Sequence, residues 1–304
     1  MEALVVRGVT KQYANHTALD MVDLTVPEKT IYGLLGPNGA GKTTMIRIIN
    51  QIINADSGSI TLFGKPLTAE HVGVIGYLPE ERGLYKKMKV GEQLIYFAQL
   101  KGLSRKDAIA RIKVWVEKFQ IQEWLNKKVE DLSKGMAQKV QFISTVMHEP
   151  RLIILDEPFS GFDPVNAQLI TEEILDLKKK GCTIIFSTHR METVEDLCDD
   201  IALINKSKKI LEGSKKSVKA QYKTNTFLVE HKGVFSLDNS SYQLITQNSI
   251  DDGLYNSTIK MNGAGSPNDL IGELIRKTEV SGFQEKIPSM SEIFISLVKG
   301  VSHE

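Results

Sequence analysis

A glycine-rich segment near the start of the chain constrains its fold more than any other stretch. It matches the pattern G-x-x-x-x-G-K-[ST] at every fixed position and consists of Gly36, Pro37, Asn38, Gly39, Ala40, Gly41, Lys42, Thr43 and Thr44. The apolar run from Ile31 to Leu35 predicts a strand before it, and the apolar-rich run from Met45 to Ile53 predicts a helix after it. The motif therefore lies between a strand and a helix, which is the context that it requires.

The residue types of this segment suit a site for phosphate groups. Glycines let successive backbone N–H groups converge on phosphate oxygens, and the start of the helix adds the positive end of its dipole. We expect Lys42 to reach the β- and γ-phosphates of a nucleotide and the Thr43 hydroxyl to bind Mg²⁺. A glycine-rich turn without a ligand is the alternative, and the number of fixed positions disfavours it.

Two later apolar runs predict buried strands that end near the same site. Leu152 to Leu155 is entirely apolar and is followed by the carboxylates Asp156 and Glu157, which require a cation such as Mg²⁺ where a parallel strand faces a ligand crevice. His189 comes just after the run from Cys182 to Phe186. A histidine in that place either satisfies a turn or contacts a γ-phosphate.

Three other positions allow both a structural and a functional interpretation. Ser133 precedes a predicted helix and suits an N-cap, although with Gly135 it also suits a second anion site. Glu80 closes the predicted strand from Val72 to Leu78, at the edge where ligands gather in such folds. Tyr13, at a predicted strand end, either packs in a core or stacks on a purine.

Composition excludes several classes of protein. The 304 residues suggest about two domains, and 38 basic against 37 acidic side chains leave no charge excess for nucleic acid or an anionic membrane. Cys182 and Cys198 lack metal-ligand spacing, which fits a reducing compartment. The first residues lack signal-peptide features, and no apolar run approaches a bilayer span, so we expect membrane association only through a partner.

The sequence changes character after Gly213. Three short runs predict strands, and two helices with capping boxes follow; the strands are Phe227 to Val229, Tyr242 to Thr246 and Thr258 to Met261, and the capping pairs are Ser266 with Asp269 and Ser289 with Glu292. No catalytic cluster is evident there. Residues 216–304 are therefore predicted to form a small α+β accessory domain for regulation or dimer contact.

Five stretches in this order resemble the nucleotide-binding domain of ABC ATPases over residues 1–215. They are similar to Walker A (Gly36 to Thr43), the signature sequence (Leu132 to Met136), Walker B with the catalytic glutamate (Leu152 to Glu157), the D-loop (Ser160 to Asp163) and the switch histidine (His189). The resemblance implies an α/β P-loop NTPase of ABC type, with a mixed-sheet core, an antiparallel β subdomain and a helical subdomain.

The resemblance also implies a mechanism. Two copies, or one copy and a homologous ATPase subunit, would enclose two ATP molecules, with Ser133 and Gly135 of one chain facing the γ-phosphate bound by Lys42 of the other. Thr43 and Asp156 would hold Mg²⁺, with Glu80 as a further ligand. Glu157 would polarise the attacking water and His189 would steady the γ-phosphate.

The implied partner is a multispanning membrane permease, which places the chain peripherally at the cytoplasmic side of the cell membrane, with no nucleic acid as partner. The stretches Gly76 to Tyr85 and Pro288 to Phe294 resemble the ATPase subunits of ABC-2 exporters similar to sodium-efflux ATPases. Two departures stand out: Glu80 replaces the usual glutamine, and Lys134 and Met136 alter the usual Leu-Ser-Gly-Gly-Gln signature.

Two other functions remain open. One is a soluble ABC ATPase in translation or nucleic-acid maintenance, which is disfavoured by the single cassette, the near-neutral charge and the lack of sustained heptads between Thr44 and Ser133. The other is a catalytically silent regulatory module, which would explain Glu80, Lys134 and Met136. Measurable Mg²⁺-dependent ATPase activity of the purified protein or its complex would exclude the silent module.

Overall fold

The computed structural model describes residues 1–304 except 82, 160–162, 238–239, 252, 264 and 300–304. The chain divides into two compact units, Met1–Lys215 and Lys216–Glu304. Each unit is described by itself. No helix of the described residues is long and apolar enough to cross a bilayer.

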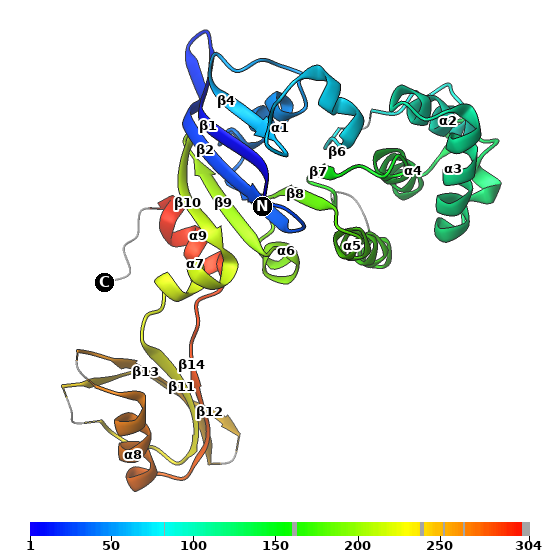
Figure 1. Ribbon diagram of the computed structural model, residues 1–304. Coiled ribbons are helices and arrows are strands. Elements are labelled where there is room, and N and C mark those ends of the chain that lie inside the picture. Colours follow the sequence, from blue (N-terminus) through cyan, green and yellow to red (C-terminus); the bar gives the residue numbers. More distant parts are fainter. Residues whose placement is uncertain (82, 160–162, 238–239, 252, 264, 300–304) are drawn as a thin grey trace. The chain divides into compact units, whose positions relative to one another are not determined.

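The central sheet of the first unit has the strand order β10-β9-β3-β8-β7-β6 (Figure 1). Its strands are β3 (Ile31–Leu35), β6 (Ile75–Leu78), β7 (Leu152–Asp156), β8 (Thr183–Thr188), β9 (Asp200–Asn205) and β10 (Lys208–Ser214). All are parallel except the edge strand β10, which runs antiparallel to β9. Every residue of β3, β7 and β8 is buried, as expected for apolar strands covered on both faces.

A second, antiparallel sheet lies beside the first and has the order β2-β1-β4-β5. Its strands are β1 (Glu2–Tyr13), β2 (His16–Pro27), β4 (Ser57–Leu62) and β5 (Lys65–Pro66). A single hydrophobic core joins alternate residues of β1 and β2 to helix α1 (Lys42–Ile49) and to the central sheet. This core fixes the β1–β2 hairpin against the loop that follows β3.

Helices form the rest of the first unit. Helix α2 (Val90–Leu100) packs against α3 (Arg105–Phe119) and α4 (Lys134–Val146). Ser104 and Ser133 N-cap α3 and α4 by accepting bonds from the Asp107 and Met136 N–H groups. Short 3₁₀ turns, Gln122–Trp124 and Val129–Asp131, connect these helices; α5 (Pro164–Lys179) and α6 (Met191–Leu197) follow β7 and β8.

The second unit contains a sheet of order β12-β13-β11-β14. Its elements are α7 (Lys215–Gln221, which begins at the boundary), β11 (Thr226–Lys232), β12 (Tyr242–Asp251), β13 (Leu254–Met261), α8 (Pro267–Lys277), β14 (Val280–Glu285) and α9 (Met290–Lys299). The inward residues of β11 and β13 pack against Leu270 and Leu274 of α8. Ser289 and Glu292 form the expected reciprocal capping box of α9.

The fold prediction is confirmed, and three local predictions needed correction. The expected strand from Val72 to Leu78 begins only at Ile75, because a 3₁₀ helix spans Ala69–Val74 and its capping box joins Thr68 to His71. The helical block expected from Val90 to Glu130 divides at Gly102, and α3 ends where Gln120 adopts left-handed backbone. The sequence analysis also missed β14 altogether.

Candidate functional site

The loop between β3 and α1 requires glycine at two positions for reasons of space. Gly36 (φ 152°) and Gly41 (φ 114°) both have positive φ. A Cβ atom at Gly36 would lie 2.2 Å from the Ile204 carbonyl oxygen, and one at Gly41 would lie 2.4 Å from the Ala18 carbonyl oxygen. The loop backbone is thus held directly against β9 and the β1–β2 hairpin. Only glycine allows such close approach with these dihedral angles.

Lys42 folds back over this loop. Its Nζ donates to the carbonyl oxygens of Gly36 (2.7 Å) and Pro37 (3.1 Å), and the residue is only 7% exposed. Burial lowers the pKa of the Lys42 ammonium, whereas the nearby carboxylates of Glu157 and Asp156 act in the opposite direction. The ammonium is therefore held by two weak acceptors beside the N-terminus of α1, where an anionic phosphate would be a stronger partner.

The carboxylate of Asp156 lies opposite the start of α1. The parallel register pairs Asp156 with Ser187, and Asp156 is 2% exposed. The Thr43 hydroxyl donates to Asp156 Oδ2 at 3.3 Å. Burial raises the pKa of the Asp156 carboxyl, and the neighbouring charge of Glu80 raises it further. A cation at this point would relieve both effects.

Glu157 follows directly and adopts left-handed backbone with φ 48°. Its side chain is held by the end of β8: His189 Nδ1 and the His189 backbone N–H lie 2.7 and 3.0 Å from Oε1, and the Thr188 hydroxyl donates to Oε2 at 3.2 Å. The carboxylate is mostly buried, with 11% of the side chain exposed, whereas the imidazole of His189 is 57% exposed. Glu157 is therefore oriented by residues of the neighbouring strand.

One cavity of about 410 Å³ brings most of the predicted site residues together. Its lining consists of Tyr13, His16, Ala18, Asn38, Gly39, Gly41, Lys42, Thr43, Thr44, Glu80, Asp156, Glu157 and His189. The sequence analysis missed His16 and Ala18. Their signal was the β1–β2 hairpin, which pairs His16 with Tyr13 and so brings both to the mouth of the loop.

Tyr13 has the form of an exposed ring platform. It is 44% exposed, and Lys11 Nζ lies 5.6 Å from its ring centroid. Lys11 is in turn bound to Asp56 at 2.7 Å. The ring is not among the buried core residues, which disfavours the packing alternative considered from the sequence, and its exposed part can be reached by a planar ligand.

Ser133 and Gly135 do not line this cavity. Ser133 accepts a hydrogen bond from the Met136 N–H (3.3 Å) at the start of α4. A Cβ atom at Gly135 would meet only Asn166 Nδ2, at 3.7 Å. Residues 160–162 of the predicted D-loop lie outside the described residues, and Asp163 N-caps α5 by accepting from the Asn166 N–H at 3.0 Å.

A smaller cavity of about 300 Å³ borders the first and shares Glu80, Asp156 and Glu157 with it. Lys134 and Gln138 of α4 also line it. The departures at Glu80 and Lys134 thus introduce opposite charges beside one cavity. Gln141 of α4 connects this helix to the chain after β6, since its Nε2 donates to the carbonyl oxygens of Pro79 (3.3 Å) and Glu81 (3.4 Å).

The oxygen atoms beside the phosphate loop suit a hard divalent cation that takes most of its ligands from phosphates and water. Among the residues that the structure describes, no group of three or more His, Cys, Asp or Glu side chains could hold a metal by itself. Thr43 and Asp156 instead offer one hydroxyl and one carboxylate beside the phosphate loop. Mg²⁺ is usually bound in this way, through one or two protein oxygens together with phosphates and water.

Two family models match the chain. One is described as ABC transporter and covers residues 19–160, and the other as the C-terminal domain of DrrA1-3-like ATP-binding proteins and covers residues 213–298. The ABC transporter ATP-binding protein YhaQ of Bacillus subtilis (strain 168) is 42% identical, covering 98% of this chain and 99% of the relative.

A second relative and a solved structure agree with this result. The Nod factor export ATP-binding protein I of Mesorhizobium japonicum is 35% identical, covering 68% of this chain and 62% of the relative. A solved structure of the ATP-binding subunit of an ABC transporter superposes with a TM-score of 0.68 at 30% identity, covering 72% of this chain and 93% of that one. The chain therefore belongs to the ATP-binding proteins of ABC transporters.

Proposed function

We propose that this chain is the Mg²⁺-dependent ATPase subunit that drives a separate membrane-spanning exporter. The observation that supports this proposal best is the 410 Å³ cavity. It combines a phosphate loop with Lys42, an oriented carboxylate at Glu157 and the cation-binding pair Thr43 and Asp156. A protein that bound MgATP without hydrolysing it would need the phosphate loop and the cation-binding pair, but not an oriented carboxylate such as that of Glu157.

The residues of the cavity have distinct roles in the proposed reaction. Lys42 leaves the carbonyl groups of Gly36 and Pro37 and pairs with the β- and γ-phosphates of ATP. Thr43 and Asp156 would hold Mg²⁺, which would offset the charge that develops on the phosphates. Tyr13 stacks on the base, and Glu80 is a further ligand, through water or directly.

Glu157 acts on the attacking water. Its two oxygens are oriented by Thr188 and His189, so one carboxylate oxygen accepts a proton from a water that lies in line with the γ-phosphate. His189 is more exposed than Glu157 and exchanges its bond to the carboxylate for one to the γ-phosphate. The Glu157 carboxylate would then lose its hydrogen bond to the imidazole only when a γ-phosphate is present.

The site is completed by a second subunit. Ser133 and Gly135 lie outside the cavity of their own chain, and the first turn of α4 offers N–H groups in a form suited to an anion. We infer that they face the γ-phosphate bound by a second copy or by a homologous subunit. ATP then closes the dimer, and hydrolysis reopens it.

The closing and reopening of the dimer drive conformational changes in a permease. We place the chain at the cytoplasmic side of the membrane, bound through this partner, because its relatives are ATP-binding proteins of ABC transporters. Export as the direction is supported by the relative that is named for Nod factor export.

We propose a regulatory or dimer-contact role for residues 216–304. Unchanged ATPase rate, dimerisation and transport after their deletion would contradict this role.

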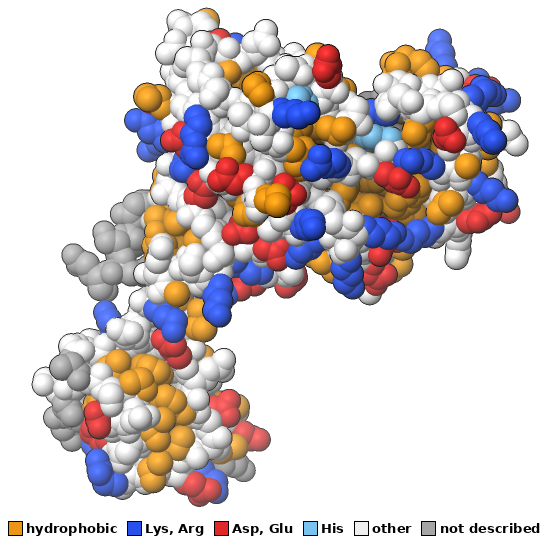
Figure 2. Space-filling view, viewed as in Figure 1, with side chains coloured by type: hydrophobic (Ala, Val, Ile, Leu, Met, Phe, Trp, Pro, Cys, Tyr) orange, Lys and Arg blue, Asp and Glu red, His pale blue; other side chains and the backbone are white. Residues whose placement is uncertain are grey.

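The alternative role in translation or nucleic-acid maintenance receives no support from the surface. On the face of the first unit drawn in Figure 2, basic and acidic side chains are interspersed, in keeping with a net charge of +1. A nucleic-acid-binding surface would instead be expected to concentrate positive charge.

The test is a pull-down of tagged Glu157→Gln protein from detergent-solubilised native membranes in the presence of ATP. We expect one multispanning membrane protein in stoichiometric amount, because ATP binding without hydrolysis holds the closed state. Lys42→Ala is the matched control and should recover the same permease without ATP dependence. Recovery of ribosomes or nucleic acid in place of a membrane protein would favour the alternative.

A further inference from the structure

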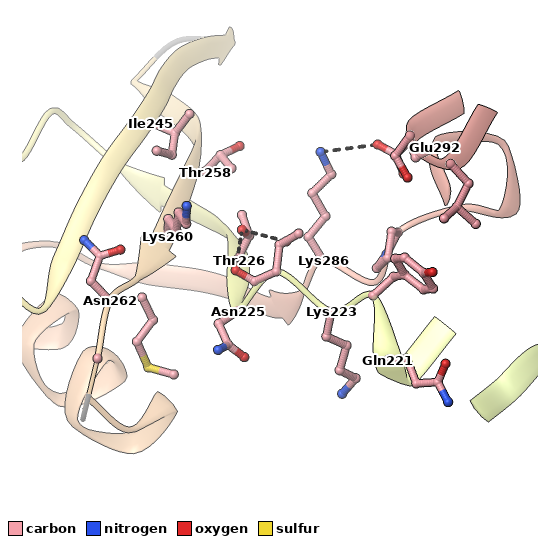
Figure 3. A pocket seen from close by; sticks show the side chains of 17 residues that line it. Gln221, Lys223, Asn225, Thr226, Ile245, Thr258, Lys260, Asn262, Lys286 and Glu292 are labelled. Carbon is pink, nitrogen blue, oxygen red and sulfur yellow. Dashed lines mark hydrogen bonds and ion pairs between the residues drawn. The ribbon is translucent and has the colours of Figure 1, made fainter. Parts of the chain in front are cut away.

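The second unit contains a cavity of about 980 Å³, more than twice the volume of the one beside the phosphate loop (Figure 3). It lies at one end of the sheet, where the start of β11 meets the ends of β13 and β14. The register brings these ends together by pairing Thr226 with Lys260 and Phe227 with Glu285. The segments that connect α7 to β11 and β14 to α9 also line it.

The cavity lies on the open face of this sheet. Phe227, Val229 and Ile259 point to the opposite face, where they pack in the core with α8. Thr258 and Lys260 alternate with Ile259 along β13 and therefore project from the cavity side, and Asn262 continues this row just beyond the strand. A hydroxyl, an ammonium and an amide thus follow one another at a spacing of two residues.

The charge of the cavity is predominantly positive. Lys223, Lys260 and Lys286 line it, and Glu292 is the acidic residue of the described lining. Lys223 is bound to Glu285 at 2.6 Å, whereas Lys286 Nζ lies 3.7 Å from Glu292, as the dashed line in Figure 3 marks. Lys260 has no ion-pair partner among the residues that the structure describes.

The neutral donors of the row also lack protein partners. In the described part of the chain, neither the Thr258 hydroxyl nor the Asn262 side-chain amide makes a hydrogen bond to another protein group. Thr226 differs, because its hydroxyl is already bonded to Thr224. Within the described part of the chain, the row on β13 therefore presents one cation and two neutral donors without a protein partner.

We propose that this cavity binds a small molecule through a phosphate group. The ammonium of Lys260 can donate to one phosphate oxygen while a short neighbouring donor two residues away, the hydroxyl of Thr258 or the amide of Asn262, donates to another. The described lining offers lysine point charges rather than an arginine fork, so the planar bidentate pairing preferred by carboxylates is not provided. The volume falls within the range of pockets for ligands of drug size.

An occupant of this cavity would contact both connections of the unit. Lys286 belongs to the segment that leads from β14 to α9, and Asn225 to the one that leads from α7 to β11. A phosphate near Lys286 would compete with Glu292, whose distance of 3.7 Å marks a loose pair. Binding would thus change the contact between β14 and α9.

The phosphate has two possible sources, a soluble organophosphate and a lipid headgroup, and the experiment separates them. Full-length protein in a Lys42→Ala background, which weakens the phosphate loop, is titrated calorimetrically with glycerol 3-phosphate and tested for flotation with phosphatidylglycerol or phosphatidylcholine vesicles. Lys260→Gln and Thr258→Val are compared with Lys232→Gln, whose lysine lies at the other end of β11 and pairs with Glu279.

We expect Lys260→Gln to weaken binding about tenfold or more, as for loss of a charge-assisted bond, and Thr258→Val to weaken it severalfold. Lys232→Gln should bind as the background protein does. Binding of glycerol 3-phosphate identifies a soluble ligand, and Lys260-dependent flotation with phosphatidylglycerol alone identifies a headgroup. The proposal is overturned if neither probe binds. It is also overturned if Lys260→Gln and Thr258→Val proteins, with the same unfolding temperature as the Lys42→Ala background protein, bind the probe as tightly as that protein does.

Discussion

The imidazole Nδ1 of His189 lies 2.7 Å from Oε1 of Glu157, and the backbone N–H of His189 donates to the same oxygen. His189 therefore contacts the Glu157 carboxylate through two groups. Its backbone N–H is fixed in place, whereas its imidazole can rotate to another partner. The backbone contact persists when the imidazole turns to another partner. Glu157 can thus keep its position while its charge environment changes.

Glu157→Gln should abolish most hydrolysis while ATP binding is kept. The amide preserves the size of the side chain but cannot accept the proton of the attacking water, so we expect the rate to fall by about a hundredfold or more. ATPase assays and gel filtration with ATP measure the two effects, and the variant should accumulate a dimer. Glu172→Gln, on the exposed face of α5, is the control. Wild-type turnover of Glu157→Gln would reject the role.

Gly41→Ala should damage the phosphate loop far more than Gly39→Ala does. Both positions have positive φ, so each alanine carries a backbone strain of about 1 kcal/mol. A Cβ atom meets nothing within 4 Å at Gly39 but would lie 2.4 Å from the Ala18 carbonyl oxygen at Gly41. We expect an additional loss of about 1–3 kcal/mol of unfolding free energy in urea, together with loss of ATP binding. Equal stability of the two variants would show that the β1–β2 hairpin moves to accommodate the Cβ atom at position 41 without a measurable cost in free energy.

Lys134 and Glu80 should be energetically coupled in ATP binding. They line one cavity with opposite charges beside two further carboxylates. Lys134→Met leaves those carboxylates without the nearby cation, so we expect ATP affinity to fall about fivefold, and Glu80→Gln in the same chain to restore most of it. Lys139→Met, elsewhere on α4, serves as the control in calorimetric titrations. If the effects of Lys134→Met and Glu80→Gln on ATP affinity were additive, the two residues would not be coupled.

His148 should make stability depend on pH between about 4 and 6.5. Burial lowers the pKa of this imidazole to about 4, and its Nε2 donates to the Ile75 carbonyl oxygen at 3.3 Å. The unfolded chain therefore binds the proton more readily, so stability is full above pH 6.5 and is lost as the pH falls toward 4.

The total loss attributable to His148 is about 3 kcal/mol. Urea unfolding at several pH values measures it. His148→Gln should flatten the profile in this interval, whereas His71→Gln, a partly exposed position, should leave it as in the unaltered protein. An unchanged slope in His148→Gln would assign the pH dependence to other groups.

Sequence patterns predicted the parts of the site that are fixed by local chemistry. The phosphate loop and the carboxylates after β7 follow from short motifs whose spacing determines their geometry. His16 was missed because its place depends on strand pairing with Tyr13. β14 was missed because Val280 to Glu285 mixes polar and apolar residues around Gly282.

The cavity of the second unit was equally invisible in the sequence. Thr226 begins β11, Lys260 lies near the end of β13 and Lys286 follows the end of β14, so the three residues are far apart along the chain. Only the antiparallel register brings them together. Motif-based analysis identifies contiguous sites well, whereas a pocket assembled by long-range pairing requires the folded chain.

The left-handed backbone of Glu157 sets the catalytic role that we propose for this residue against the stability of the fold. A residue with a Cβ atom at φ 48° costs about 1–2 kcal/mol relative to glycine, and asparagine tolerates this region better than glutamate. A library selected only for thermal resistance should therefore replace Glu157 with glycine or asparagine. Thermostabilisation of this protein would need position 157 to be held constant, because the most direct stabilising change there would also remove the carboxylate that we propose acts on the attacking water.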